Sequence, residues 1–332
     1  MTKATETMIL HESRTTIDYR ILLQRFGTLT IFIALALLAT FWSDSFLTRG
    51  NILNVLRQVA SSAGVMAVGM LFVILTRGID LSVGSIAALG SVLTGYFIAT
   101  SGYGTGVTLL LVLLSGAACG AVTGLFVAYL RLPAFVITLA MMAIARGLSL
   151  IISDGRPISL GDAGQAFTDF GSGFLFGIPQ PVLVMLAVFL IGGVVLNFTR
   201  FGRLITAIGS NEEAVRLSGI AVPRYIVAVY VISGVLSAVA GMISASRTAV
   251  GSAQTGVSAE LNVIAAVVIG GASLMGGRGG VVNTFLGVLI MGMIANIMNL
   301  AGVPGYHQQV YMGLIIIVAM LLQYSTGWIK RS

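Results

Sequence analysis

Apolar runs of about 20 residues recur along the whole chain and are separated by short polar stretches. A helix needs roughly 20 apolar residues to cross the hydrocarbon core of a bilayer. Because that core holds no water, backbone polar groups must bond within the crossing segment, and runs of this length do so as helices. Composition agrees, since 57% of the residues are hydrophobic and only 9% are charged, unlike a soluble domain. We therefore predict an all-α, polytopic membrane protein.

Ten membrane spans are predicted, with boundaries uncertain by a few residues. They cover residues 28–46, 60–77, 81–100, 106–130, 134–152, 180–198, 226–246, 260–274, 281–300 and 308–326. Polar tails of residues 1–27 and 327–332 flank this membrane domain of residues 28–326. The second and third spans are joined by almost nothing and the eighth is short. A broken or re-entrant helix is therefore allowed for at residues 77–85 and 260–274.

The basic residues give the orientation. With both termini in the cytosol, 13 Lys and Arg residues fall on the cytosolic side and 4 fall outside, as the positive-inside rule requires. The net charge of +7 is thus a signal of topology and not of nucleic-acid binding. This orientation places the polar stretch at residues 200–224 in the cytosol and the long loop at residues 153–179 outside.

A polar island at residues 210–220 reads as one short capped helix. Ser210 precedes Glu213 by three residues, the spacing of a capping box, and Gly219 supplies the stop. Helices this short are marginal alone in water, so the island should dock against another surface through Ala214, Val215, Leu217 and Ile220. The plainer alternative is a cytosolic loop with a capped turn.

A charged junction links the second and third spans. Arg77 and Asp80 stand three residues apart between two glycines, which is costly at membrane depth unless the pair reaches the interface or lines a polar space. One interpretation is a tight turn in which the two charges neutralise each other. The other is a gate or pathway element at the cytosolic mouth.

Several functions are disfavoured by what the sequence contains. The only lysines are Lys3 and Lys330, outside any glycine-rich loop, so no phosphate-binding P-loop is expected. The two histidines and the single Cys119 offer no metal cluster, and neither a cofactor nor a metal is expected. A carrier coupled to an ion gradient should hold buried carboxylates near mid-membrane, and the chain offers only Asp80 and Glu260, both near span ends, which disfavours such coupling.

Three segments in order resemble the ribose-type sugar permeases of bacterial ABC importers. They are residues 78–85 (GIDLSVGS), 207–220 (AIGSNEEAVRLSGI) and 268–280 (VIGGASLMGGRGG). The resemblance implies a multi-pass protein of the bacterial inner membrane, working with two cytosolic ABC ATPase subunits or one fused double ATPase, a periplasmic sugar-binding protein and a second permease copy, identical or not. It also implies that the second segment is the ATPase-coupling loop, with contact candidates Gly209, Asn211, Glu212, Glu213, Ala214, Val215, Leu217, Gly219 and Ile220.

Small and hydroxyl residues suggest where a solute could pass. The gate or pathway candidates are Arg77, Asp80, Ser82, Ser85, Ser233, Ser237, Asn296 and Asn299. Close helix packing through small residues explains the same pattern in the seventh span. Arg146 lies near enough to a span end to snorkel and is given no substrate role. The glycine-rich stretch at residues 270–280 is read as a compact turn, and the loop at residues 153–179 as a folded element that offers a docking platform.

The function predicted from the sequence is the translocating subunit of an ATP-driven importer for a neutral pentose or hexose, embedded in membrane lipid. A nucleoside or a sugar-like signalling molecule is the alternative substrate, and a stand-alone facilitator is the alternative class.

Overall fold

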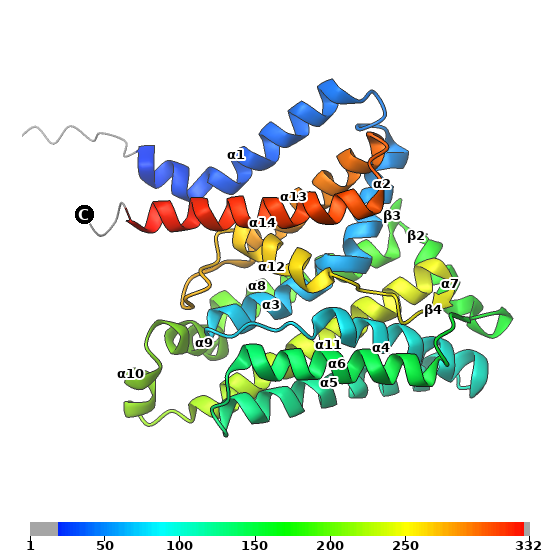
Figure 1. The fold of residues 1–332 in the computed structure, drawn as a ribbon, viewed down its shortest axis with the longest axis horizontal. Helices are drawn as coiled ribbons and strands as arrows, with labels where there is room; N and C mark the ends of the chain where they lie inside the picture. Colours follow the sequence, from blue (N-terminus) through cyan, green and yellow to red (C-terminus); the bar gives the residue numbers. More distant parts are fainter. Residues whose placement is uncertain (1–18, 329–332) are drawn as a thin grey trace, which may run out of the picture.

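The computed structural model describes residues 19–328, and helices dominate it (Figure 1). Within this part of the chain, seven helical segments are long and apolar enough to cross a membrane, and Gly27–Trp42 and Ala259–Ile269 are shorter apolar helices. The seven are Arg49–Leu75, Val83–Thr100, Thr105–Ala128, Ala134–Ile152, Gln180–Phe198, Val222–Thr248 and Val281–Leu300. The predicted all-α, polytopic class is confirmed.

Most of the main helices run roughly along the long axis of the molecule, and the first, drawn in blue, is inclined to it (Figure 1). In chain order they are α1 (Tyr19–Trp42), α2 (Arg49–Val59), α3 (Val65–Leu75), α4 (Val83–Gly95), α5 (Thr105–Ala128), α6 (Ala134–Ile152), α8 (Gln180–Phe198), α11 (Val222–Thr248), α12 (Ala259–Ile269), α13 (Val281–Leu300) and α14 (Gly305–Trp328). A π-turn at Ala60–Gly64 joins α2 to α3, and another at Tyr96–Thr100 extends α4. The span predicted at residues 60–77 therefore starts earlier, because the helix continues back through Gln58 and Arg57.

Helix α11 lies at the centre of the bundle and packs against α3, α4 and α5. Glycines make this possible, since a Cβ built on Gly234 would lie 2.2 Å from the carbonyl oxygen of Gly116, and one on Gly116 would lie 2.5 Å from that of Gly234. Small residues let helix backbones approach this closely. The packing interpretation of the small residues in this span is confirmed.

Two non-helical segments interrupt the bundle. The first linker, residues 76–82, connects α3 to α4, and the second linker, residues 249–258, connects α11 to α12. The second linker approaches the start of α4, just after the first linker, where a Cβ on Gly84 would lie 2.3 Å from the carbonyl oxygen of Gly256. The tight turn considered for residues 77–85 is wrong, because seven residues outside any helix separate α3 from α4.

One end of the bundle carries a folded loop at residues 153–179, and we call it the α7 end. Strand β1 (Ile158–Ser159) pairs antiparallel with β4 (Val250–Gly251), and β2 (Phe174–Leu175) pairs with β3 (Ile178–Pro179). Helix α7 (Gln165–Ser172) lies between these strands, with Phe167 buried. The predicted folded surface element is confirmed.

The opposite end, the α10 end, carries α9 (Arg200–Ser210) and α10 (Glu212–Leu217). The glycine-rich turn after α12 lies against the end of α9, since a Cβ on Gly277 would lie 2.4 Å from the hydroxyl oxygen of Ser210. It also contacts the end of α3, because the N–H of Gly277 donates to the carbonyl of Leu75 at 3.0 Å. A Cβ on Gly270 would lie 2.6 Å from the carbonyl oxygen of Asn283, so α12 and α13 also touch closely. The compact turn predicted at residues 270–280 is confirmed.

Candidate functional site

The polar island contains one short helix, α10, as predicted, but its N-cap differs from the prediction. Helix α9 continues to Ser210, whose hydroxyl donates to the carbonyl of Thr206, so Ser210 is already helical and cannot be the N-cap. The N-cap of α10 is Asn211, whose Oδ1 accepts from the N–H of Ala214 at 3.0 Å. Glu213 pairs with Arg216 instead of closing a capping box, and this contact raises the pKa of Arg216. Gly219 follows the helix with a φ of +80°, the left-handed stop that was predicted.

The apolar residues of this island divide between two directions. Val215 is buried against Ile208 and Val222, and Ile220 packs on the same cluster. Leu217 is 79% exposed and Ala214 is also exposed, beside the exposed carboxylates of Glu212 and Glu213. The island is thus anchored to its own bundle through one face and presents the other face to the surroundings.

Arg77 ties the three predicted motifs together at the α10 end. Its Nε donates to the carbonyl oxygens of Gly209 at 2.7 Å and Met275 at 3.1 Å, and its Nη2 donates to that of Ser210 at 2.9 Å. Gly209 itself touches the end of α3, where an added Cβ would lie 1.7 Å from the carbonyl oxygen of Leu75. The first linker, the end of α9 and the glycine-rich turn therefore meet at one guanidinium.

Asp80 is not the partner of Arg77. Its carboxylate is 2% exposed and accepts hydrogen bonds from the N–H and hydroxyl of Ser82, at 3.0 and 2.6 Å, and from the hydroxyl of Ser233 at 2.7 Å. The neutralising pair considered from the sequence is wrong, because carbonyls hold the arginine and hydroxyls hold the acid. A buried carboxylate costs free energy unless such donors surround it.

The remaining pathway candidates lie in packed or locally bonded places. The hydroxyl of Ser237 donates to the carbonyl of Ser233, and Ser85 is buried in α4. Asn296 exchanges side-chain hydrogen bonds with Asn51, at 2.9 and 2.8 Å. Asn299 accepts from the side chain of Gln308 at 2.8 Å. The structure joins Ser82 and Ser233 to Asp80, and it leaves Ser237 and the two asparagines apart from that group.

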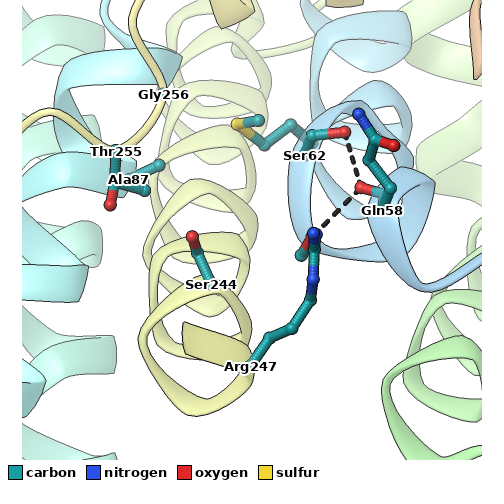
Figure 2. A pocket seen from close by; sticks show the side chains of 9 residues that line it. Gln58, Ser62, Ala87, Ser244, Arg247, Thr255 and Gly256 are labelled. Carbon is teal, nitrogen blue, oxygen red and sulfur yellow. Dashed lines mark hydrogen bonds between the residues drawn. The ribbon is translucent and has the colours of Figure 1, made fainter. Parts of the chain in front are cut away.

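A polar cavity of about 230 Å³ lies near the α7 end, and sequence reasoning did not find it. Figure 2 shows Gln58 and Ser62 on one side, Ala87, Thr255 and Gly256 on the other, and Ser244 and Arg247 between them. The polar lining comes from α2, the π-turn, α11 and the second linker: Gln58, Ser61, Ser62, Ser244, Arg247 and Thr255. None of these residues was among the gate or pathway candidates.

Hydrogen bonds fix this cavity from both sides. Nη1 of Arg247 donates to the hydroxyl of Ser61 at 2.7 Å, and the hydroxyls of Ser61 and Ser62 both donate to the carbonyl of Gln58. A π-turn accommodates one extra residue in a helix and recurs at functional sites. Among these wall residues, only Arg247 carries a formal charge, and it forms no salt bridge with any residue that the structure describes.

The second linker is held in place by neighbouring helices. Arg146 of α6 donates to the carbonyls of Ala253 and Thr255. Ser91 of α4 accepts from the N–H of Ser252 at 3.1 Å and from the hydroxyl of Thr255 at 3.2 Å. Arg146 therefore positions backbone inside the protein, which differs from the snorkelling expected of it.

A bundle of apolar helices with non-helical segments in its interior and a polar cavity is the architecture of a membrane transport protein. Within the described part of the chain, no group of three His, Cys, Asp or Glu residues could hold a metal ion. The fold and the site therefore define a polytopic membrane protein with a polar cavity, as transport proteins have.

The chain belongs to the permease family described as the branched-chain amino acid transport system permease component, which matches residues 51–320. It is 41% identical over 310 residues to the ribose import permease protein RbsC of Haemophilus influenzae, covering 93% of this chain and 95% of the relative. It is 43% identical over 300 residues to RbsC of Bacillus subtilis, covering 90% and 92%. Identity to the L-arabinose transport system permease protein AraH of Escherichia coli is 38% over 316 residues, covering 93% of each chain. No solved structure matches it. The resemblance to ribose-type permeases is confirmed, and the chain is a permease, a transport component and not an enzyme.

Proposed function

We propose that this chain is the membrane-spanning subunit of an ATP-driven importer that takes up a neutral monosaccharide delivered by an external binding protein. The observation that carries the proposal is the similarity to ribose and L-arabinose permeases over at least 90% of this chain. The partners are two cytosolic ATPase subunits or one fused double ATPase, a periplasmic sugar-binding protein and a second permease copy.

Uptake of labelled ribose and L-arabinose tests this function directly. The permease is expressed with its cognate ATPase and binding protein in bacteria that lack their own pentose importers. Uptake of at least one sugar should persist when the proton gradient is collapsed while ATP is maintained. Uptake that stops under this treatment would identify a gradient-driven carrier and reject the proposal.

The α9–α10 unit is proposed as the contact with the ATPase. Its support is the division described above, in which Val215 anchors α10 to the bundle while Leu217 and two carboxylates face outwards. Because α10 leads through Gly209 to Arg77, a displacement of this unit would reach the first linker.

Two substitutions separate anchoring from docking. Val215→Pro should distort α10, because proline in a helix interior costs about 3 kcal/mol or more, and it should abolish uptake while membrane insertion persists. Leu217→Ser should leave stability within about 0.5 kcal/mol, as exposed substitutions do, yet reduce co-purification of the ATPase. Normal uptake by a correctly inserted Val215→Pro permease would contradict the assignment.

Ten spans with both termini in the cytosol are proposed as the topology. The described ends of α1 and α14 lie at the α10 end in Figure 1, which supports this orientation, as does the excess of arginine there. Single cysteines at Ser159 and Ser218, in a background with Cys119 replaced, should label with an impermeant thiol reagent on intact cells at position 159 only. Labelling of position 218 but not of position 159 would contradict this ten-span topology.

A further inference from the structure

The polar cavity near the α7 end has a construction that a packing defect would not need. Its walls come from four chain segments, and the Arg247 side chain crosses towards the π-turn, where the hydroxyl of Ser61 holds it (Figure 2). Ser61 in turn donates to the carbonyl of Gln58 at 3.1 Å. The guanidinium is therefore fixed in direction before any solute arrives, which lowers the entropic cost of binding.

The hydrogen-bonding groups of the walls match a polyol. A guanidinium carries five N–H donors, and the structure shows one nitrogen of Arg247 bonded to Ser61. The hydroxyls of Ser244 and Thr255 and the amide of Gln58 can each donate and accept. Adjacent hydroxyl groups on one solute can accept from the guanidinium and donate to the amide oxygen at the same time.

The charges of the walls disfavour cations. No carboxylate lines the cavity, so a cation would find no counter-charge and would meet the positive charge of Arg247. Arg247 would attract an anion as well as a hydroxyl group, so the neutral charge of the solute follows from the proposed function and not from the walls.

The size of the cavity limits the solute. Its volume of about 230 Å³ is that of roughly eight water molecules in the liquid, at about 30 Å³ each. This space suits a single sugar ring. Gly256 lines the cavity, and its carbonyl oxygen would lie 2.3 Å from a Cβ on Gly84, so neither the linker nor α4 has room for an added side chain at this contact.

We propose that this cavity is an internal binding site for one neutral monosaccharide, with Arg247 and Gln58 contacting adjacent hydroxyl groups and Ser244 and Thr255 forming the opposite wall. The proposal rests on the proposed function and adds the place at which the sugar is held. It moves the site away from Ser237 and Asn299, which the sequence had suggested. Affinity at the site should be weak, because a tightly held solute would leave slowly.

The test is protection of a cysteine inside the cavity. The permease–ATPase complex, without binding protein, is reconstituted in liposomes with Cys119→Ala and Ser244→Cys. A small methanethiosulfonate reagent should modify position 244 at least threefold more slowly at high ribose or L-arabinose concentration. Ser159→Cys, in the exposed loop before α7, is the control and should react at an unchanged rate.

Adding Arg247→Gln to the Ser244→Cys protein should abolish the protection, Arg247→Lys should retain part of it, and the exposed Arg156→Gln should retain all of it. Co-purification with the ATPase checks that each variant is folded. If the Arg247→Gln protein does not co-purify, the loss of protection is measured with Arg247→Lys instead. Wild-type uptake of a sugar that gives no protection would overturn this proposal and leave the importer function standing. Failure of the wild type to import either sugar would overturn the proposed function itself.

Discussion

The two linkers differ in how the protein stabilises their non-helical backbone. Each carries backbone through the protein interior without helical hydrogen bonds, where unpaired polar groups are costly. The first linker brings its own charge, since Asp80 accepts from Ser82 within the linker and from Ser233 across it. The second linker has no charged residue, and its carbonyls accept from Arg146 of α6 instead.

The difference teaches that the first linker is organised by its own charged side chains, whereas the second depends on side chains of neighbouring helices. Loss of Asp80 removes the acceptor on which a short stretch of chain is organised. Loss of Arg146 removes a donor but leaves Ser91 and the β1–β4 pairing in place. The first linker should therefore be the more sensitive of the two to a single substitution.

Asp80→Ala should have the largest effect on stability. Three donors lose their acceptor in a buried place, at about 1–3 kcal/mol for each unsatisfied group, so we expect a loss of about 3 kcal/mol or more. Asp80→Asn keeps one carbonyl oxygen and should lose less. Thermal unfolding followed by size-exclusion chromatography in detergent measures both, and an Asp80→Ala protein as stable as wild type would remove the basis of the comparison.

Arg146→Gln should have an intermediate effect. Hydrogen bonds from a charged donor contribute about 1.5–3 kcal/mol each, and partial solvent screening reduces this, so we expect a loss of about 2 kcal/mol. The exposed Arg156→Gln is the matched control and should change the unfolding temperature little. If Arg146→Gln proved more damaging than Asp80→Ala, the second linker would be the more dependent one.

Gly209→Ala and Gly219→Ala sharpen the comparison at the α10 end. A methyl group at position 209 would collide with the carbonyl of Leu75, and overpacking of this kind costs about 1–3 kcal/mol. Position 219 has open space around it, so alanine there costs only its left-handed backbone, about 1 kcal/mol. Uptake should fall strongly with the first variant and slightly with the second. Equal losses would mean that contact between α9 and α3 is not what matters.

The sequence predicted the helices better than it predicted what lies between them. Apolar length placed α6 and α8 at residues 134–152 and 180–198, as the structure has them. It missed the start of α2, because Arg57 and Gln58 interrupt the apolar pattern although their helix continues. Hydropathy detects helices that are apolar on all sides. A helix that presents polar side chains to a cavity therefore has a lower hydropathy and is missed in part.

The same contrast holds for the candidate site. Arg77 and Asp80 stood out as charges between glycines, but most of their partners could not be deduced. The carbonyls that accept from Arg77 and the Ser233 hydroxyl that donates to Asp80 lie more than 100 residues away in sequence. The sequence gives little indication of the cavity. Gln58, Ser244 and Arg247 are far apart along the chain and become neighbours only in the folded structure, beside the π-turn and the second linker. A pattern along one helix cannot report a wall built from four segments.

The approach of Gly84 to Gly256 has a consequence for how such a permease can diverge. At this contact main chain meets main chain, which every amino acid shares, whereas the cavity beside it is lined mostly by side chains, which a point mutation can exchange. Preference among solutes and the close approach of α4 to the second linker thus depend on different atoms. A lineage can change what the walls recognise and still keep this contact, provided that positions 84 and 256 stay glycine.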